Sequence, residues 1–236
     1  MKVVLFDMDG VLVDVSRSYR QAIKKTAEKF LKKEIKLDCI REYKNRGGLN
    51  NDWDLTEFIL KDNGLNIVKQ EIIDVFQAFY LGKDFDGLIL DEYWLASGEM
   101  LSMIKKNFKT GIVTGRPREE ALFTLKRFRM EEFFQVVIAM EDVPPGKGKP
   151  DPIGIKLAMD RLGVVDGWYI GDTIDDMLAA RAAGLIPLGI ASNSAGRQLL
   201  KENGAIKVLK NLNEFPTINN IGKPQESLAV RSSRAS

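Results

Sequence analysis

The 236-residue sequence contains no histidine. This absence excludes histidine general bases, serine–histidine triads, phosphohistidine intermediates and nearly all zinc enzymes. Any acid–base or metal chemistry must therefore use carboxylates, lysines, hydroxyls and backbone groups. Because carboxylate oxygens are hard ligands, the metal ions that suit such a chain are magnesium and manganese.

Cysteine, net charge and long apolar runs are also scarce. The one cysteine, Cys39, cannot form an internal disulfide. No run approaches the roughly eighteen apolar residues that a membrane span needs, and no signal peptide precedes the first apolar run. We therefore expect a cytoplasmic protein with no membrane partner. The net charge of +2 gives no reason to expect a nucleic-acid partner.

One basic segment departs from this balance. Residues 17–36 carry eight lysines and arginines and two glutamates. Such a stripe can bind nucleic acid or form the solvated face of a helix. Because no nucleic-acid-binding motif accompanies it, the solvated face is the favoured interpretation, and part of the stripe can still steer anionic substrates.

The sequence does contain a series of short apolar runs separated by helical patterns. The runs typical of buried strands are Val3–Phe6, Gly111–Thr114, Phe134–Ala139, Trp168–Gly171, Ile186–Ala191 and Ile206–Leu209. The helical patterns between the later runs are Arg118–Arg129, Pro152–Leu162, Asp175–Ala183 and Ser194–Asn203. This alternation predicts an α/β fold, a doubly wound parallel sheet that binds ligands at the carboxyl ends of its strands.

Residues 16–98 interrupt this alternation with helical patterns alone. Apolar residues recur at helical spacing in Ser16–Lys33, Leu55–Leu60 and Ile72–Leu81. We therefore expect a small helical cap domain at 16–98, inserted into a core formed by 1–15 and 99–215. The tail, 216–236, shows no periodicity and is expected to be disordered.

The segment VLFDMDGVLVD, residues 4–14, ends its apolar run in Asp7 and Asp9, followed by Gly10. Asp-Gly between apolar runs can turn a hairpin. Alternatively, the two carboxylates form a reaction centre, because side chains two residues apart on an extended strand share a face.

Three further polar stretches follow strands of the expected sheet. They are Thr114–Gly115, Lys147–Lys149 and Asp172–Asp176. Taken singly, each can be a turn, a solvated loop or a helix cap. Together they supply carboxylates for a divalent cation, and a hydroxyl, a backbone N–H and a lysine for an anion. Phosphoryl transfer requires this combination.

In this order and spacing, the four stretches resemble the motifs of the haloacid dehalogenase superfamily, in particular its phosphatase branch. The matching positions are Asp7–Gly10, Thr114, Lys149 and Gly171–Asp176. The helical insert between the first two motifs is similar to the cap of phosphoglycolate phosphatases and β-phosphoglucomutases. The resemblance implies a phosphatase that hydrolyses a small phosphorylated metabolite through an aspartyl-phosphate intermediate, as a monomer or homodimer.

The resemblance also implies catalytic roles. Asp7 would be the nucleophile, and Asp9 would be first the general acid and then the general base. Thr114 and the Gly115 N–H would bind phosphoryl oxygens, and Lys149 would compensate the negative charge of the nucleophile and the transition state.

A metal site is implied by the same resemblance. Mg²⁺ would be held by Asp7, the backbone carbonyl of Asp9 and Asp172, with Asp176 in or near the coordination shell. The ion would keep Asp7 ionised and reduce its repulsion of the incoming phosphate.

Residues that bind the substrate are expected in and near the cap. The segment NRGGLNNDWDL, residues 45–55, lies where the family has its specificity loop; the alternative is a plain turn with a helix N-cap. The candidates are Arg20, Arg46, Asn50, Asn51 and, just after the second motif, Arg116. Arginines suit an anionic leaving group such as that of phosphoglycolate, whereas Asp52 or Asp54 suits a cationic one such as that of histidinol phosphate.

Two other functions remain open. Phosphomutases of the β-phosphoglucomutase type share every core motif, so the family's base rate, and no particular residue, favours a phosphatase. A non-catalytic binding protein on this fold would show an eroded motif, and none of the four is eroded. Dehalogenation is disfavoured, because the family's dehalogenases need neither the second aspartate nor a metal.

Overall fold

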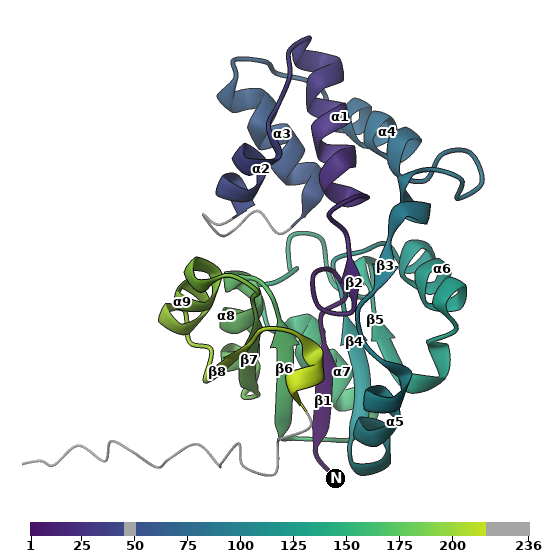
Figure 1. Ribbon diagram of the computed structural model, residues 1–236, viewed down its shortest axis with the longest axis vertical. Helices are drawn as coiled ribbons and strands as arrows, with labels where there is room; N and C mark the ends of the chain where they lie inside the picture. The colour runs from purple at the N-terminus through teal and green to yellow at the C-terminus, as the bar shows by residue number, and fades with distance from the viewer. Residues whose placement is uncertain (45–50, 216–236) are drawn as a thin grey trace, which may run out of the picture.

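The computed structural model describes residues 1–44 and 51–215 of the chain. Its central feature is a six-stranded parallel sheet in the order β5-β4-β1-β6-β7-β8 (Figure 1). The strands are β1 (Val3–Phe6), β4 (Lys109–Val113), β5 (Val136–Ile138), β6 (Gly167–Gly171), β7 (Ile186–Ile190) and β8 (Lys207–Leu209). The predicted α/β fold and its six strands are thus confirmed, although the edge strands β5 and β8 are only partly buried.

The central position of β1 follows from its pairing on both edges. Val3 is paired with Lys109 of β4 on one side and with Gly167 of β6 on the other. All four residues of β1 are fully buried, which explains why its sequence is a continuous apolar run. The carboxyl end of β1 therefore lies between the ends of β4 and β6, which carry two of the other candidate stretches.

Helices cover both faces of this sheet. Val3 and Leu5 belong to the apolar cluster of α7 (Ile153–Leu162) and α8 (Ile174–Ala183). Val4 and Phe6 belong to the cluster of α5 (Gly98–Asn107) and α6 (Arg118–Phe128). This division follows the period-two alternation of side chains along the strand. The last helix, α9 (Ser194–Glu202), contributes Leu200 to a third apolar cluster.

Four helices form a separate layer beyond the carboxyl ends of the strands (Figure 1). They are α1 (Tyr19–Leu31), α2 (Leu37–Lys44), α3 (Asp52–Asp62) and α4 (Lys69–Tyr80). The predictions included α1, α3 and α4 but not α2, in which Ile40 is the one buried residue. The helix has only eight residues, so Leu37, Ile40 and Tyr43 at helical spacing form a pattern too short to predict it.

Two connecting segments join this layer to the sheet, and they lie side by side. The two-residue strands β2 (Val13–Asp14) and β3 (Tyr93–Trp94) pair in antiparallel register. The Leu95 N–H also donates to the Leu12 carbonyl at 2.8 Å. The outgoing and returning segments are therefore hydrogen-bonded to each other between the helical layer and the sheet.

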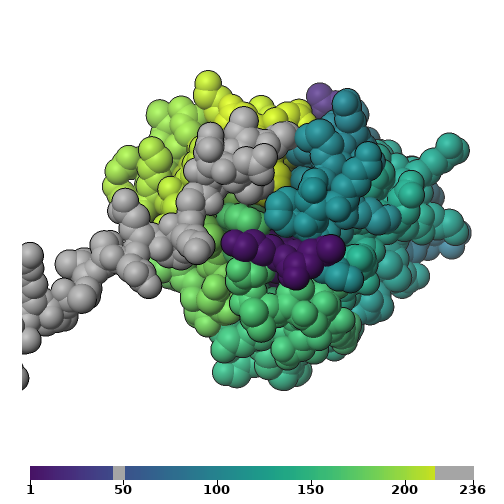
Figure 2. Space-filling view, turned by 90° about the horizontal axis from the view of Figure 1, so that it is seen from below, coloured from purple at the N-terminus to yellow at the C-terminus, as the bar shows by residue number. Residues whose placement is uncertain are grey.

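The face of the molecule opposite the helical layer carries the beginning of the chain. In Figure 2 the first residues lie at this surface between the teal and green parts of the chain. Within residues 1–44 and 51–215, no helix combines the length and the apolar character needed to cross a membrane.

Candidate active site

Asp7 lies at the centre of the carboxyl edge of the sheet. Its N–H donates to the Ile170 carbonyl of β6 at 2.8 Å, which extends the pairing of β1 by one residue. Its side chain is buried, and the chain turns immediately afterwards, since the Leu12 N–H donates to the Met8 carbonyl at 2.9 Å. The strand thus ends in a tight turn that holds Asp7 in the interior.

Gly10 is required in this turn for two reasons. Its φ of +75° is a left-handed conformation that glycine adopts without a steric penalty. In addition, a Cβ at this position would lie 2.0 Å from Asp172 Oδ2. The Asp-Gly pair therefore does form a turn, and this turn lets Asp172 approach the end of β1.

Lys149 brings the first and fourth motifs together. Its Nζ lies 2.7 Å from Asp7 Oδ1 and 2.6 Å from Asp176 Oδ1. It also donates to the Tyr169 hydroxyl at 3.0 Å. The Lys149 side chain is 5% exposed, so its charge interacts with the two carboxylates with little screening by water.

The pKa values of this group reflect burial and mutual charge. Burial raises the pKa of Asp7 well above its usual value, Lys149 opposes this shift, and Asp176 adds to it. Burial alone would lower the pKa of Lys149, but Asp176 and Asp7 raise it well above its usual value. A cation at this site would favour the ionised form of Asp7.

Asp176 is fixed by the start of α8. Thr173 is the N-cap residue, and its hydroxyl accepts from the Asp176 N–H at 3.2 Å. In return, the Asp176 carboxylate accepts from the Thr173 N–H at 3.0 Å and the Asp172 N–H at 3.2 Å. This capping box orients the carboxylate. Burial would raise the pKa of Asp176, but Lys149 and the Thr173 hydrogen bonds bring it below its usual value.

Three carboxylates at this edge can hold a metal ion. Asp7, Asp172 and Asp176 offer oxygen atoms that all lie within 4.8 Å of one another. Asp172 Oδ1 is buried and accepts no hydrogen bond from the described residues. Burial, with a further contribution from Asp176, raises the pKa of Asp172 to about 7. An unsatisfied buried oxygen among hard oxygen ligands fits a divalent cation.

Thr114 and Gly115 follow β4 beside these carboxylates. Gly115 lines a cavity of about 70 Å³ together with Asp7 and Asp9, and Thr114 lines an adjoining cleft with Lys149. The Thr114 hydroxyl accepts from the Arg116 N–H at 3.1 Å. A hydroxyl and backbone groups next to a fixed ammonium can bind phosphoryl oxygens.

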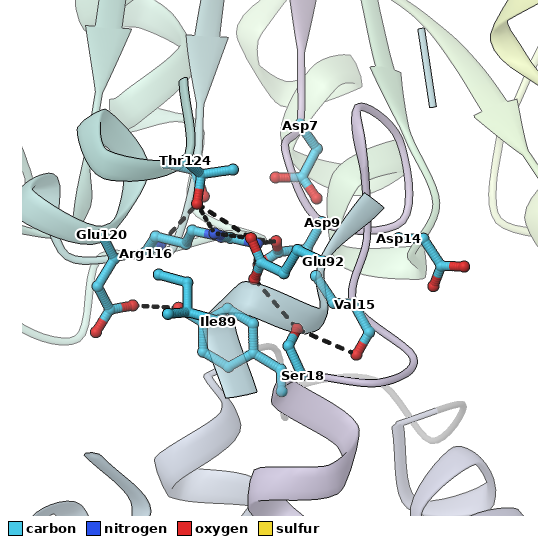
Figure 3. Close-up of polar contacts among 12 residues, drawn as sticks. Asp7, Asp9, Asp14, Val15, Ser18, Ile89, Glu92, Arg116, Glu120 and Thr124 are labelled. Carbon is cyan, nitrogen blue, oxygen red and sulfur yellow. Dashed lines mark hydrogen bonds and ion pairs between the residues drawn. The ribbon is translucent and has the colours of Figure 1, made fainter. Parts of the chain in front are cut away.

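Arg116 is buried, and its guanidinium binds protein groups (Figure 3). Nε donates to Asp9 Oδ1 at 2.7 Å, and Nη1 and Nη2 donate to the two oxygens of Glu92 at 3.2 and 2.9 Å. Nη1 also donates to Tyr80 and Thr124. We expected Arg116 to contact the substrate; the structure makes it the partner of Asp9, and a direct substrate contact stays a prediction.

The helical layer forms the other wall of the cavity. It contributes Tyr19, Arg20, Lys44, Asn51, Asp52 and Trp53. Arg20 and Asn51 are among the predicted residues, whereas Arg46 and Asn50 lie outside the described residues. Asn51 is also the N-cap of α3, because its Oδ1 accepts from the Trp53 N–H at 2.9 Å. Asn51 thus caps α3 and also lines the cavity, and its contact with the substrate stays a prediction.

An ion pair lies in this wall. Lys44 Nζ is 2.7 Å from Asp52 Oδ1. Burial would lower the pKa of Lys44, but Asp52 raises it above its usual value. The wall thus presents a paired cation and anion to the cavity.

Several residues of the site were not predicted from the sequence. Glu92 lies in the connecting segment just before β3, and its partners Arg116 and Ser18 are 24 and 74 residues away. Tyr169 lies in the apolar run of β6, where an aromatic residue is usually part of the core. No local spacing marks either residue, because their contacts arise only when distant segments meet.

The chain matches a known family over most of its length. The family model described as haloacid dehalogenase-like hydrolase matches residues 1–184. The phosphorylated carbohydrates phosphatase of Thermotoga maritima is 30% identical over 217 residues, covering 89% of this chain and 94% of that protein. The phosphatase Tt82 structure from Thermococcus thioreducens is 27% identical, with a TM-score of 0.62, over 85% of this chain and 99% of that chain.

One relative is longer than this chain. The imidazoleglycerol-phosphate dehydratase of Phytophthora nicotianae is 37% identical over 200 residues, which is 80% of this chain. The match spans 43% of that protein's length. The similarity therefore concerns less than half of that protein.

Proposed function

Because the chain belongs to the haloacid dehalogenase-like hydrolases and is a phosphatase of that family, we propose that it hydrolyses a small phosphorylated metabolite through an aspartyl phosphate on Asp7. The observation that carries this proposal is the position of Lys149 Nζ, 2.7 Å from Asp7 Oδ1. An ammonium fixed beside a carboxylate nucleophile offsets the negative charges of the carboxylate and the incoming phosphate, which otherwise repel each other.

Two carboxylates divide the chemical work in this proposal. Asp7 attacks phosphorus, and the bond from phosphorus to the ester oxygen breaks while Asp9 protonates the departing alcohol. Asp9 then takes a proton from water, whose oxygen attacks phosphorus, releases inorganic phosphate and restores the Asp7 carboxylate. Thr114 and the Gly115 N–H bind the phosphoryl oxygens in both steps, and Lys149 balances their charge.

We propose Mg²⁺ as the cofactor. Asp7, Asp172 and Asp176, with the backbone carbonyl of Asp9, would hold it. When bound, the ion supplies positive charge that stabilises ionised carboxylates and phosphoryl oxygens. The unsatisfied Asp172 Oδ1 supports this assignment. Chelation by EDTA should abolish activity, and added Mg²⁺ should restore it.

The favoured substrate is a phosphomonoester with an anionic leaving group, such as phosphoglycolate. Arg20 and Lys44 line the cavity and supply cations for such a group. The adjoining cleft of about 680 Å³, which Trp53 also lines, leaves room for the leaving group beyond the phosphate. We also propose that the protein works in the cytoplasm as a monomer or homodimer.

A second candidate substrate is an imidazole-bearing phosphate ester such as histidinol phosphate. The observation in its favour is the similarity to a protein named for imidazoleglycerol phosphate. Asp52, which lines the cavity, offers an anion for a cationic leaving group. The pairing of Asp52 with Lys44 has to open for this contact to form.

One experiment tests the proposed function. The protein is assayed with Mg²⁺ on a panel of phosphorylated metabolites that includes phosphoglycolate, histidinol phosphate and sugar phosphates. Release of inorganic phosphate that stops with EDTA and with Asp7→Asn supports the proposal. An isomerised sugar phosphate as the product would indicate a phosphomutase, and inactivity on the whole panel would indicate a binding protein.

A further inference from the structure

Glu92 is a buried glutamate where the chain returns from the helical layer. It lies between a short 3-10 helix, η1 (Leu88–Asp91), and β3, and its side chain is 0% exposed. The hydroxyl of Ser18, on the outgoing segment, donates to Glu92 Oε1 at 3.1 Å. Both connecting segments therefore converge on one carboxylate, as Figure 3 shows for Ser18 and Glu92.

Further donors come from two helices. The Tyr80 hydroxyl at the end of α4 donates to Glu92 Oε1 at 2.9 Å, and the Thr124 hydroxyl of α6 donates to Oε2 at 3.0 Å. Tyr80 also stacks on Tyr19 at the start of α1. The carboxylate thus has a fixed position relative to both the helical layer and the sheet layer.

Arg116 connects this carboxylate to Asp9. The same guanidinium binds both oxygens of Glu92 and, through Nε and Nη2, a single oxygen of Asp9, Oδ1. Its side chain is 1% exposed, and its Cζ lies 4.9 Å from the centre of the Tyr19 ring. A planar guanidinium held by so many acceptors cannot turn without breaking several of these bonds.

We propose that Glu92 is a positioning residue that acts on Asp9 through Arg116. The two N–H groups on Oδ1 leave Oδ2 as the Asp9 oxygen that exchanges a proton with the substrate and with water. Glu92 fixes the orientation of the guanidinium and thereby of Oδ2. This inference rests on the proposed function, because it takes Asp9 as the acid and base of the reaction.

A purely structural role for the same residues is the alternative. Burial of the Arg116–Glu92 ion pair does not by itself indicate a stabilising role. The cost of removing both charges from water offsets much of their attraction. A structural role predicts that loss of Glu92 affects all substrates equally. A positioning role predicts a larger loss of kcat/KM for a substrate whose leaving group must be protonated than for one whose leaving group departs as a stable anion.

The test compares two phosphate esters in the presence of Mg²⁺. In p-nitrophenyl phosphate the leaving group is a stabilised anion that departs without a proton, whereas a simple alkyl phosphate releases an alcohol that needs one. The value of kcat/KM reports only the steps up to release of the alcohol. The Glu92→Gln variant retains the size of the side chain, removes its charge and replaces one accepting oxygen with a donating NH2 group.

We expect Glu92→Gln to lower kcat/KM for the alkyl phosphate about tenfold or more, and for p-nitrophenyl phosphate by less than about threefold. Arg127→Met is the matched control, because Arg127 donates to backbone carbonyls of the same segment, including that of Glu92 at 3.2 Å. This control should affect the two substrates equally. An equal fall in both values for Glu92→Gln would overturn the proposal.

Two precautions keep the result interpretable. If Glu92→Gln does not fold by circular dichroism, Thr124→Val removes one hydrogen bond to Glu92 and one to Arg116 and is compared in the same way. Failure of the proposed function has a different signature: the wild-type protein would release no phosphate from either ester, or Asp7→Asn would retain the activity.

Discussion

Lys149 Nζ lies 2.7 Å from Asp7 Oδ1, although 142 residues separate the two in the sequence. The same nitrogen lies 2.6 Å from Asp176 Oδ1. One ammonium therefore separates two buried carboxylates that would otherwise repel each other. This arrangement leads to the first prediction.

Lys149→Met should lower kcat roughly 10²- to 10³-fold, because the transition state loses a fixed cation in a site with little water. Lys147→Met is the control: Lys147 lies in the same loop and pairs with Asp151 at 3.3 Å, but its side chain is 58% exposed. Phosphate release with saturating Mg²⁺ measures both. Comparable losses of kcat in the two variants would mean that activity depends on the structure of the loop and not on the Lys149 charge.

Gly10→Ala should weaken Mg²⁺ binding about tenfold or more, because a Cβ there would lie 2.0 Å from Asp172 Oδ2 and displace that ligand. Gly64→Ala separates this effect from backbone strain, since Gly64 has a φ of +79° and no atoms within 4 Å of the added Cβ. Both variants should lose about 1 kcal/mol of unfolding free energy. Mg²⁺ titrations of activity give the affinities, and similar affinities for both variants would count against the metal site.

Glu120 should make stability depend on pH. This residue of α6 is buried, and it accepts hydrogen bonds from Tyr19 of α1 and Gln77 of α4, the latter at 2.6 Å. Burial raises the pKa of Glu120 from 4.5 to about 7. Between these values the folded protein retains a proton that the unfolded chain has released, so the free energy of unfolding falls as the pH rises to about 7.

Glu120→Gln should remove this dependence. The difference in unfolding free energy between the variant and wild type should therefore shift in favour of the variant by roughly 2 kcal/mol from about pH 5 to about pH 8. Gln77 Oε1 has no partner among the described residues and can accept a hydrogen bond from the new amide. Urea unfolding at both pH values measures the effect, with the exposed neighbour Glu119→Gln as control. If the difference in unfolding free energy between wild type and Glu120→Gln were the same at both pH values, the raised pKa of Glu120 would be contradicted.

The Lys44–Asp52 pair should discriminate between leaving groups of opposite charge. Lys44→Met should lower kcat/KM for phosphoglycolate about tenfold, because the carboxylate of that substrate loses a cation. Asp52→Asn should lower kcat/KM for histidinol phosphate by a similar factor and spare phosphoglycolate. Steady-state assays of both variants on both esters give the four values. Equal effects on both substrates would place the pair outside the specificity site.

The sheet and its site could be predicted because the relevant signals are local. Val3–Phe6 is a buried apolar run, and the polar residues that follow each strand end can be recognised within a few positions. Once a parallel sheet is inferred, its topology brings the strand ends to one edge. The rule places the Lys147–Lys149 stretch at the same edge as Asp7, and the resemblance to the family's motifs then singles out Lys149.

The network around Glu92 could not be predicted in this way. Ser18 occupies the N-cap position of α1, but its side chain makes no capping hydrogen bond. Its hydroxyl donates to Glu92, 74 residues further along the chain. The partner of such a hydroxyl depends on how the two connecting segments pair, and two-residue strands leave no pattern in the sequence.

The most direct test of the account is to locate phosphate on the enzyme during turnover. A rapid acid quench with a ³²P-labelled phosphomonoester and Mg²⁺, followed by peptide mapping, should place the label on Asp7. The label should be absent from Asp7→Asn and should disappear from the wild type as substrate is exhausted. Phosphate release with no labelled protein, or a label that persists in Asp7→Asn, would contradict the proposed mechanism.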